Sequence, residues 1–384
     1  MKVAVLGYGT VGAGVYSMLS DAPGMEAGPV LVRPGKAVES FMVSDAALIF
    51  GDPTVDAVVE TLGGLDPAYS YGMRALEAGK HFITANKAMV AAHGLELAAL
   101  AREKGAAFLF SAACGGGVPF LHNLALSAET DRIEAVSGIL NGTTNYMLDA
   151  MQRRSLSYGD ALREAQSLGY AESDPTADVS GLDTLRKMQL ACAVAFGVLP
   201  QSGMLCEGME HFTAADVEDI QSRGLVCRLI ASGCRAGESV SAYVEPVLFP
   251  RAAPESSVFT NNNMARYTGK RCGSIVLMGQ GAGRFPTASA VLRDLAAARQ
   301  GARSMFPENC RAAEADNREA VHSYYIRTGG FAAVRLPLRS VLTQGEVVRA
   351  VTEPMSAEKM HALAQNIRKD GNDLFFATLE EELC

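Results

Sequence analysis

The feature that most constrains the fold is the glycine-rich turn in KVAVLGYGTVGAGVYSML, residues 2–19. A short apolar strand runs into Gly7, Gly9 and Gly12, and apolar residues at helical spacing follow. A strand, a glycine turn and a helix in this order are typical of a dinucleotide site, in which the helix N-terminus faces a pyrophosphate. The sequence therefore predicts a nucleotide-binding α/β domain here. A plain strand-to-helix turn is the alternative interpretation.

Each glycine of this turn has a separate steric role. Gly7 permits the tight turn, Gly9 lets backbone amides approach the phosphates, and Gly12 allows close packing of the helix on the strand. Thr10 and Val11 lie between them at the start of the helix. We expect all five residues to contribute to the cofactor site.

The second apolar segment, PVLVRPGK at residues 29–36, bears on the choice of nicotinamide cofactor. It is typical of a strand that ends in Arg33, with Lys36 nearby, at the place where an NAD site usually offers a carboxylate to the ribose. A guanidinium there would suit a 2′-phosphate, so we expect NADP(H) to be favoured over NAD(H). Two solvated loop cations are the alternative.

Strand and helix patterns then alternate. The segments are VDAVVETLGG, YSYGMRALEAG, HFITAN, AMVAAHGLELAALAREKG and AAFLFSAA. Such alternation predicts a Rossmann-type, doubly wound parallel sheet, whose ligands lie at the carboxyl ends of the strands. Gly63 and Lys87 follow two of these ends, so we expect both at the cofactor site. For Lys87 the alternative is a solvated lysine in the first turn of a helix.

Composition excludes several classes of protein. A chain of 384 residues, 48% hydrophobic and 20% charged, predicts two or three globular domains. The net charge of −8 favours a small-molecule ligand, with neither nucleic acid nor a membrane as partner. The eight cysteines show no Cys-x-x-Cys pair, which favours reduced thiols and a cytoplasmic location. The glycine turn comes too early for a signal peptide, and the apolar run at 188–199 predicts a buried helix, being too short to span a bilayer.

An acidic stretch, YAESDPTADVSGLDTLRK at residues 170–187, precedes that apolar run. Asp183 and Lys187 are four residues apart, so on a helix they share a face. They could form an exposed ion pair, or a crowded pair suited to proton transfer, because burial lowers the pKa of a lysine and a carboxylate raises it. Asp174 precedes Pro175 and is expected to shape the turn.

Five segments resemble, in order and spacing, the motifs of the homoserine dehydrogenase family. They are the N-terminal glycine turn, ITANKAMVAAHG, GILNGTTNYML, LGYAESDPTADVSGLDTLRK and GQGAGRFPTASAVLRDL. The family interconverts L-aspartate 4-semialdehyde and L-homoserine by hydride transfer with NAD(P)H, a step toward threonine, methionine and isoleucine. The resemblance also implies a homodimer or homotetramer.

Three regions follow from the resemblance. Residues 1–130 with 280–318 are expected to form the NAD(P)-binding Rossmann-like domain. Residues 131–279 would form an α+β substrate and dimerisation domain with an open mixed sheet, and residues 319–384 a shortened ACT-like region. Gly281 and Gly283 would return the chain to the nucleotide domain near the cofactor.

The resemblance also assigns roles to single residues. Lys187 would be the general acid in reduction and the base in oxidation, with Asp183 orienting it and Lys87 between cofactor and substrate. The residues assigned to the substrate are Asn141, Gly142, Thr143, Tyr170, Glu172 and Asp178. NGTTNYML is also typical of a helix start with Thr143 or Thr144 as N-cap, and capping is compatible with binding a carboxylate.

One segment departs from the family pattern. FLFSAACGGGVPF, residues 108–120, matches a loop that binds a monovalent cation through main-chain carbonyls and one glutamate side chain, but Ser111 stands at the position of the glutamate. Loss of the only anionic ligand weakens a site for a hard cation, although the carbonyls of Cys114, Gly116 and Val118 remain for Na⁺ or K⁺. The side chain of Cys114 is interpreted as a small buried apolar group.

The segments beyond residue 318 are HSYYIRT, GEVVRAVTEP, SAEKMHALAQNIRK and DLFFATLEEE. They predict the order β, β, α, β, with Ser356 capping the helix, and threonine feedback is a hypothesis for this region. Two other functions stay open. Ser111 favours an oxidoreductase for another 2-amino aldehyde or alcohol, whereas both lysines and Asp183 argue against a nucleotide-binding module that has lost its activity.

Overall fold

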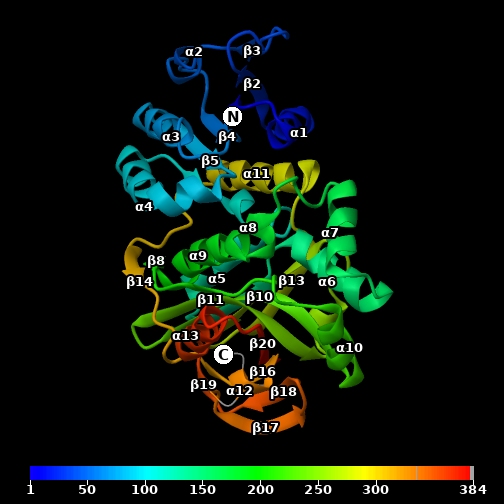
Figure 1. Ribbon diagram of the computed structural model, residues 1–384. Helices are drawn as coiled ribbons and strands as arrows, with labels where there is room; N and C mark the ends of the chain where they lie inside the picture. The colour runs from blue at the N-terminus through cyan, green and yellow to red at the C-terminus, as the bar shows by residue number, and fades with distance from the viewer. Residues whose placement is uncertain (334, 381–384) are drawn as a thin grey trace. The chain divides into compact units, whose positions relative to one another are not determined.

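The computed structural model describes residues 1–333 and 335–380 (Figure 1). By internal contacts the chain divides into two compact units. Unit 1 comprises Met1–Asp131, Ala193–Leu199 and Gly279–Arg311, and unit 2 comprises Arg132–Cys192, Pro200–Met278 and the chain from Ala312 onward. Within the described residues, no helix is both long enough and apolar enough to cross a membrane.

Unit 1 is built on a parallel sheet with the strand order β3-β2-β1-β4-β5-β6. The strands are β1 (Lys2–Leu6), β2 (Glu26–Leu31), β3 (Met42–Val43), β4 (Ala57–Glu60), β5 (His81–Thr84) and β6 (Phe108–Leu109). This is the order of a Rossmann fold, in which the direction of winding reverses beside β1 and leaves a crevice at the carboxyl ends of the strands. The predicted doubly wound α/β domain is confirmed.

Unit 1 also contains helices. They are α1 (Thr10–Leu19), α2 (Ala47–Phe50), α3 (Ala68–Glu77), α4 (Lys87–Lys104), η1 (Ser111–Ala113), α5 (Phe120–Thr130) and α11 (Arg284–Arg299). The late helix α11 packs closely on α1 at Gly14. A Cβ atom at this glycine would lie only 2.9 Å from the backbone oxygen of Arg284. The chain thus returns to unit 1 after building most of unit 2.

The end of β2 differs from the prediction. The strand stops at Leu31, whereas the sequence predicted a strand ending in Arg33. Pro34 has no amide hydrogen to continue a ladder, and the amide of Lys36 donates to the carbonyl of Arg33 at 3.0 Å, which closes a turn. Arg33 and Lys36 therefore sit on a turn after the strand.

Unit 2 contains a mixed sheet with the order β13-β12-β7-β10-β11-β20-β16-β18-β17, and β9 also pairs with β11. The strands are β7 (Ile133–Ile139), β9 (Leu205–Cys206), β10 (Leu225–Ala236), β11 (Ser239–Pro250), β12 (Asn262–Gly269), β13 (Gly273–Gln280), β16 (Tyr324–Gly329), β17 (Leu338–Thr343), β18 (Val347–Thr352) and β20 (Leu374–Leu379). Antiparallel pairs join β12, β7, β10 and β11, and β11 runs parallel to β20. The expected α+β unit with a mixed sheet is confirmed.

The remaining elements are short sheets and helices. The strands β8 (Val198–Ser202) and β14 (Arg311–Glu314) pair with each other, as do β15 (Val321–His322) and β19 (Met355–Ser356). The helices are α6 (Gly142–Arg154), α7 (Tyr158–Ser167), α8 (Thr176–Val179), α9 (Leu182–Phe196), α10 (Ala214–Ser222), η2 (Pro254–Ser257), α12 (Gly330–Ala333) and α13 (Ala357–Lys369). The apolar run predicted as a buried helix forms the buried end of α9 and then enters β8.

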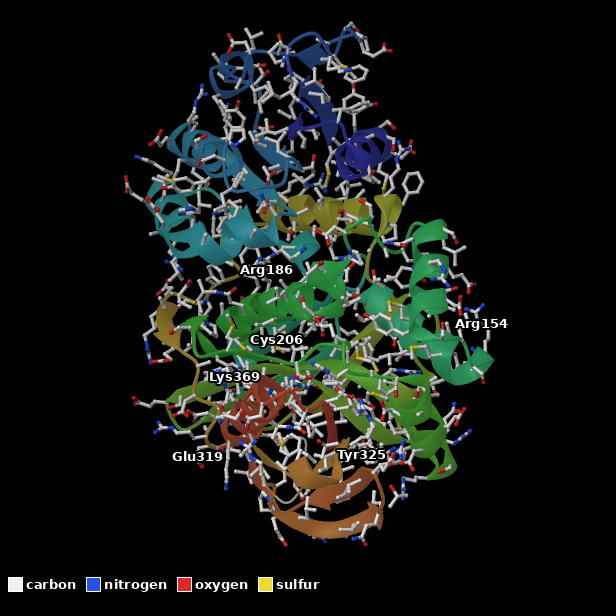
Figure 2. All side chains as sticks on the ribbon, in the orientation of Figure 1. Arg154, Arg186, Cys206, Glu319, Tyr325 and Lys369 are labelled. Atoms are coloured by element: carbon white, nitrogen blue, oxygen red, sulfur yellow. The ribbon has the colours of Figure 1, made fainter. Side chains whose placement is uncertain are left out.

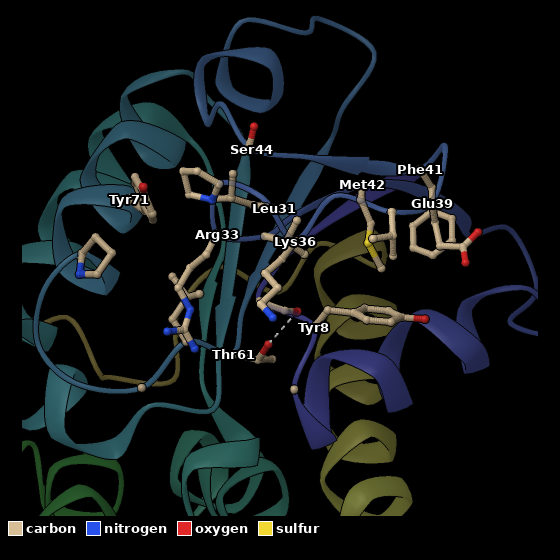
Figure 3. A pocket seen from close by; sticks show the side chains of 18 residues that line it. Tyr8, Leu31, Arg33, Lys36, Glu39, Phe41, Met42, Ser44, Thr61 and Tyr71 are labelled. Carbon is tan, nitrogen blue, oxygen red and sulfur yellow. Dashed lines mark hydrogen bonds between the residues drawn. The ribbon is translucent and has the colours of Figure 1, made fainter.

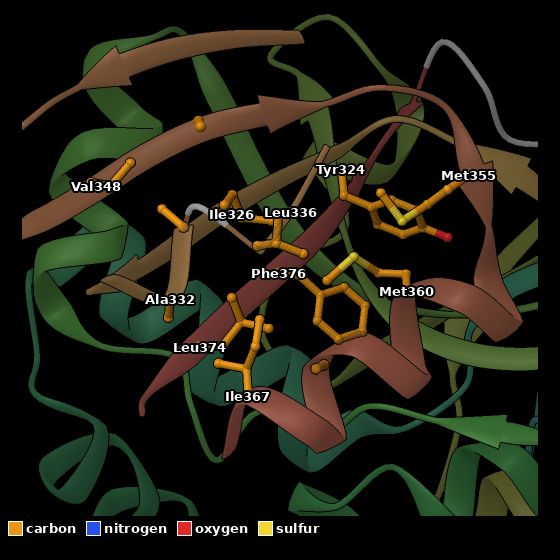
Figure 4. Close-up of a cluster of buried hydrophobic side chains, with 13 residues drawn as sticks. Tyr324, Ile326, Ala332, Leu336, Val348, Met355, Met360, Ile367, Leu374 and Phe376 are labelled. Atoms are coloured by element: carbon orange, nitrogen blue, oxygen red, sulfur yellow. The ribbon is translucent and has the colours of Figure 1, made fainter. Parts of the chain in front are cut away.

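The C-terminal segments form the predicted β, β, α, β order as β16, β18, α13 and β20, with β17 as an additional strand. The Ser356 side chain accepts a hydrogen bond from the Lys359 amide and so caps α13, as predicted. Figure 4 shows their apolar core, in which Met360 of α13 lies beside Phe376 of β20 and Ile367 lies beside Leu374. These strands extend the sheet of unit 2, and the ACT-like comparison stays a prediction. Residues 381 and 382 of the last segment lie outside the described residues.

Most cysteines match the expectation of reduced thiols. The cysteines present as thiols are Cys114, Cys192, Cys206, Cys227, Cys272 and Cys310. Cys234 is disulfide-bonded, so the expectation is wrong at that position. Cys384 lies outside the described residues.

Candidate active site

The glycine turn of unit 1 opens onto a cavity of about 1000 Å³ (Figure 3). The predicted cofactor residues in its lining are Gly7, Gly9, Arg33, Lys36 and Gly63, joined by Tyr8, Glu39 and Thr61. Within the described residues, this lining does not include Thr10, Val11, Gly12, Lys87, Gly281 or Gly283. The cavity lies at the strand ends where a Rossmann sheet binds its ligand.

The three glycines have the steric surroundings that their roles require. Gly7 has a φ of +98°, which side chains of L-residues rarely adopt. A Cβ atom at Gly12 would overlap the carbonyl oxygen of Gly7 and lie 2.7 Å from Oγ1 of Thr61, whereas a Cβ at Gly9 would meet no atom within 4 Å. Gly12 therefore allows close packing, and Gly9 leaves open space above the turn at the N-terminus of α1.

A buried carboxylate, Glu60 at the end of β4, holds the neighbouring loops. Its side chain is 0% exposed, and Oε1 accepts hydrogen bonds from the amides of Leu62 and Gly63 at 2.5 and 3.2 Å. Oε2 accepts from the hydroxyl of Thr84, at the end of β5, at 2.5 Å. One carboxylate thus joins the ends of two adjacent strands.

The start of α4 belongs to the same network. Asn86 is the N-cap, accepting a hydrogen bond from the Met89 amide at 3.1 Å, and its side-chain amide donates to the carbonyl of Gly64 at 2.5 Å. The backbone amide of Asn86 donates to the hydroxyl of Thr84 at 2.9 Å. Lys87 is the first residue of α4, so this network fixes the backbone from which its side chain extends.

The acidic stretch of unit 2 converges on Asn141, which follows β7. Asn141 is the N-cap of α6, and its Oδ1 accepts from the Thr144 amide at 2.9 Å. The prediction that Thr143 or Thr144 is the cap was wrong, because the amide side chain of Asn141 already reaches the free backbone donors. Its Nδ2 donates to Asp178 at 2.7 Å and to Asp183 at 3.0 Å.

Lys187 extends from α9 toward the same carboxylate. Its Nζ lies 2.6 Å from Oδ2 of Asp183 and donates to the carbonyl oxygen of Leu140 at 2.6 Å. The two side chains are 13% and 12% exposed, which favours the crowded pair over the exposed ion pair. A lysine ammonium has three donors, and these two acceptors fix its direction.

The other predicted substrate residues lie around the start of α6. The hydroxyl of Thr143 donates to the carbonyl of Tyr170 at 2.5 Å, and the ring of Tyr170 meets that of Tyr146 edge-on. Gly142 lies against Asn261, whose carbonyl oxygen would be 2.7 Å from an added Cβ. Glu172 is exposed, and among the described residues no hydrogen bond joins its carboxylate to the cluster.

The supporting helices are tied together by charge. Figure 2 marks Arg154 near the end of α6, whose guanidinium donates to Glu164 of α7 at 2.9 Å and to the hydroxyl of Tyr146 at 3.1 Å. Asp174 accepts from the hydroxyl of Thr176 at 2.6 Å, which forms the turn expected there.

The predicted cation loop runs from β6 through η1 to the start of α5. Cys114 is a buried thiol, which agrees with its interpretation as a small buried side chain. Gly116 packs against the backbone of Gly281, and Gly283 precedes the first residue of α11. No cluster of three or more His, Cys, Asp and Glu side chains suited to a metal occurs in the described part of the chain.

Glu60, Thr84 and the Leu140 carbonyl were not among the predicted site residues. A backbone carbonyl leaves no signal in a sequence. Glu60 did leave one, because an acid in the last position of a short, otherwise apolar strand must find donors where the parallel strand ends.

Family comparisons agree with this arrangement. Residues 7–111 match the NAD-binding domain of homoserine dehydrogenase, and residues 119–296 match the homoserine dehydrogenase domain. A homoserine dehydrogenase of Synechocystis is 37% identical over 77% of this chain and 72% of the relative, and that of Corynebacterium glutamicum is 38% identical over 77% and 71%. The solved homoserine dehydrogenase of Thiobacillus denitrificans superimposes with a TM-score of 0.87 at 29% identity, over 99% of this chain and 98% of that one.

The sequence matches and the structural match therefore agree over both units. The chain belongs to the homoserine dehydrogenase family.

Proposed function

We propose that this protein interconverts L-homoserine and L-aspartate 4-semialdehyde with a nicotinamide cofactor, and that Lys187 is the general acid and base. The observation that supports this most is the position of the Lys187 ammonium, held between the carboxylate of Asp183 and the carbonyl of Leu140. An ammonium fixed in this way suits proton transfer to an oxygen atom.

The proposed reaction transfers a hydride and a proton, and different groups would supply them. A bound nicotinamide would supply or accept the hydride. Lys187 would donate a proton to the aldehyde oxygen as negative charge develops there, and in the reverse direction its neutral amine would take the proton of the hydroxyl. Asp183 would hold Lys187 in position during both reduction and oxidation.

The substrate's own charges suggest how it is oriented. The carboxylate of Asp178 would attract the substrate ammonium. Asn141 and Thr143 would contact the substrate at the N-terminus of α6, where backbone amides and the helix dipole favour a carboxylate. Two opposite charges at a fixed separation would align the reacting carbon with the proton donor.

We infer that NADP(H) is preferred over NAD(H), and two residues of the cavity in unit 1 support this. Arg33 and Lys36 both line this cavity, and Glu39 is the one acid in the lining as far as the chain is described. A guanidinium and an ammonium together match the doubly charged 2′-phosphate better than a ribose hydroxyl.

The remaining proposals concern the protein's setting. A homodimer or homotetramer is supported by β13 at the edge of the sheet, where the apolar side chains of Val276 and Met278 are exposed. The reduced thiols favour the cytoplasm, and the reaction would serve threonine and methionine biosynthesis. Light scattering of the purified protein would measure the oligomer.

Homoserine oxidation with NADP and with NAD tests the proposed function. Lys187→Met should lower kcat by about 10²- to 10⁴-fold, the usual contribution of a positioned acid or base, and leave the KM for the cofactor unchanged. Lys104→Met is the matched control, because Lys104 is an exposed lysine paired with Glu103. The proposal is wrong if wild-type protein forms no NADPH or NADH from homoserine, or if Lys187→Met matches the control. Faster oxidation of another 2-amino alcohol would favour the other substrate class.

A further inference from the structure

The loop of residues 111–118 does not fit the cation site that the family resemblance implies. Such a site needs oxygen ligands, and a carboxylate among them carries most of the attraction for a hard monovalent cation. Position 111 is a serine, which supplies no carboxylate, and other groups of this chain hold the loop.

The first group is Asp294 on α11. Its carboxylate accepts hydrogen bonds from both the amide and the hydroxyl of Ser111, at 2.7 and 2.5 Å. Both residues are 1% exposed. The serine hydroxyl therefore donates its hydrogen bond to α11, and both oxygens of the buried carboxylate hold the loop on that helix.

The second group is Arg293, the preceding residue of the same helix. Its Nη2 donates to the carbonyl oxygen of Gly117 at 3.2 Å, inside the segment of Cys114, Gly116 and Val118 whose carbonyls would bind the cation. A guanidinium is always charged, so it repels a second cation bound nearby. Its Nη1 is buried and has no hydrogen-bond partner among the described residues.

Backbone contacts complete the attachment. The amide of Gly117 donates to the carbonyl of Gln280 at 3.0 Å, and the carbonyl of Val118 accepts from the Phe120 amide at 2.7 Å. Together these contacts hold the loop through side chains and backbone groups of the protein.

We propose that Arg293 supplies the positive charge of this loop and Asp294 its carboxylate, so that neither Na⁺ nor K⁺ is required for folding or turnover. The part that concerns turnover rests on the proposed function. The part that concerns folding does not.

Thermal unfolding separates the two parts. The full-length wild-type protein is melted in choline chloride, sodium chloride and potassium chloride at equal ionic strength. Because a ligand that binds the folded state raises Tm, the proposal expects the three values to agree within about 1 °C. Homoserine oxidation in the same salts should agree within twofold. A rise in Tm or in kcat/KM with Na⁺ or K⁺ that saturates would overturn the proposal, and an absence of oxidation in every salt would refute only the proposed function.

Variants of α11 test the role of the guanidinium. Arg293→Met should lower Tm by roughly 3–8 °C through loss of a charged hydrogen bond, and Arg293→Lys should recover part of the loss. Arg299→Met is the matched control on the same helix, where Arg299 donates to the carbonyl of Pro23, far along the helix from the loop. Equal melting of Arg293→Met and wild type would overturn the proposal.

Discussion

Replacing Glu60 by glutamine tests whether one buried carboxylate holds two strand ends of the cofactor site. The change keeps the size of the side chain but leaves one acceptor oxygen. If that oxygen serves the amides of Leu62 and Gly63, the new NH₂ group faces the Thr84 hydroxyl, which already accepts from the amide of Asn86 at 2.9 Å. The hydroxyl proton then has lost its acceptor.

The cost can be worked from these contacts. A buried group left without its partner costs about 1–3 kcal/mol, and two amides would exchange a charged acceptor for a neutral one. We expect Glu60→Gln to lower the free energy of unfolding by about 2–4 kcal/mol. At roughly 2–4 °C per kcal/mol for a folding unit of this size, Tm should fall by roughly 4–16 °C.

Calorimetry and steady-state kinetics measure the two consequences. Because Gly63 lines the cofactor cavity, the KM for NADP should rise about tenfold, the equivalent of one lost interaction, while kcat changes less. Glu77→Gln, an exposed acid at the end of α3, is the matched control. A Tm for Glu60→Gln within about 1 °C of that control, with an unchanged KM, would refute the reasoning, since a fall of several degrees is required.

Three further predictions follow from single contacts. Gly12→Ala should destabilise the protein by about 1–3 kcal/mol or more in chemical denaturation, because the added carbon overlaps a backbone oxygen, whereas Gly9→Ala should leave stability unchanged and raise only the KM for the cofactor. Arg33→Gln combined with Lys36→Gln should lower the ratio of kcat/KM for NADPH to that for NADH by roughly 10- to 100-fold, through loss of charged hydrogen bonds to a phosphate; an unchanged ratio would argue against NADP preference. Burial, and then the charge of a nearby arginine, lower the pKa of His81, whose Nδ1 accepts from a backbone amide. Because its pKa is lowered, a neutral His81 stabilises the fold above the pKa of the unfolded state, and this stabilisation is lost as the pH falls through the pKa of the folded state. The difference in Tm between wild type and His81→Leu should therefore shrink from pH 7.5 to pH 5.5.

The fold of unit 1 was predictable because its signals are local. An apolar strand, a glycine turn and a helix follow one another within a few residues, and each repetition adds a parallel strand. The end of β2 was less predictable, since the turn at Arg33 depends on a hydrogen bond to Lys36 that the residue types do not specify.

The site of unit 2 was predictable in its residues more than in its contacts. The spacing of Asp183 and Lys187 placed them on one face of a helix, and the structure pairs them. It could not show that Asn141 would cap α6 and also bind both acids, because those acids lie 37 and 42 residues away. Their convergence depends on packing between segments that are distant in the sequence, and the periodicity of a single sequence predicts only local structure.

The position of β20 has a consequence for how the chain folds. This strand ends at Leu379, yet it lies inside the sheet, parallel to β11 on one side and antiparallel to β16 on the other. The pairing of Val247 with Thr378 closes a loop of more than a hundred residues, and contacts so distant in sequence form slowly. β9 pairs with β11 at Tyr243 and Val244, but the edge of β11 at Val247 and Leu248 stays open until β20 has been made. Until β20 is in place, that edge is open to pairing with another chain, so unit 2 should be prone to aggregation while its sheet is incomplete.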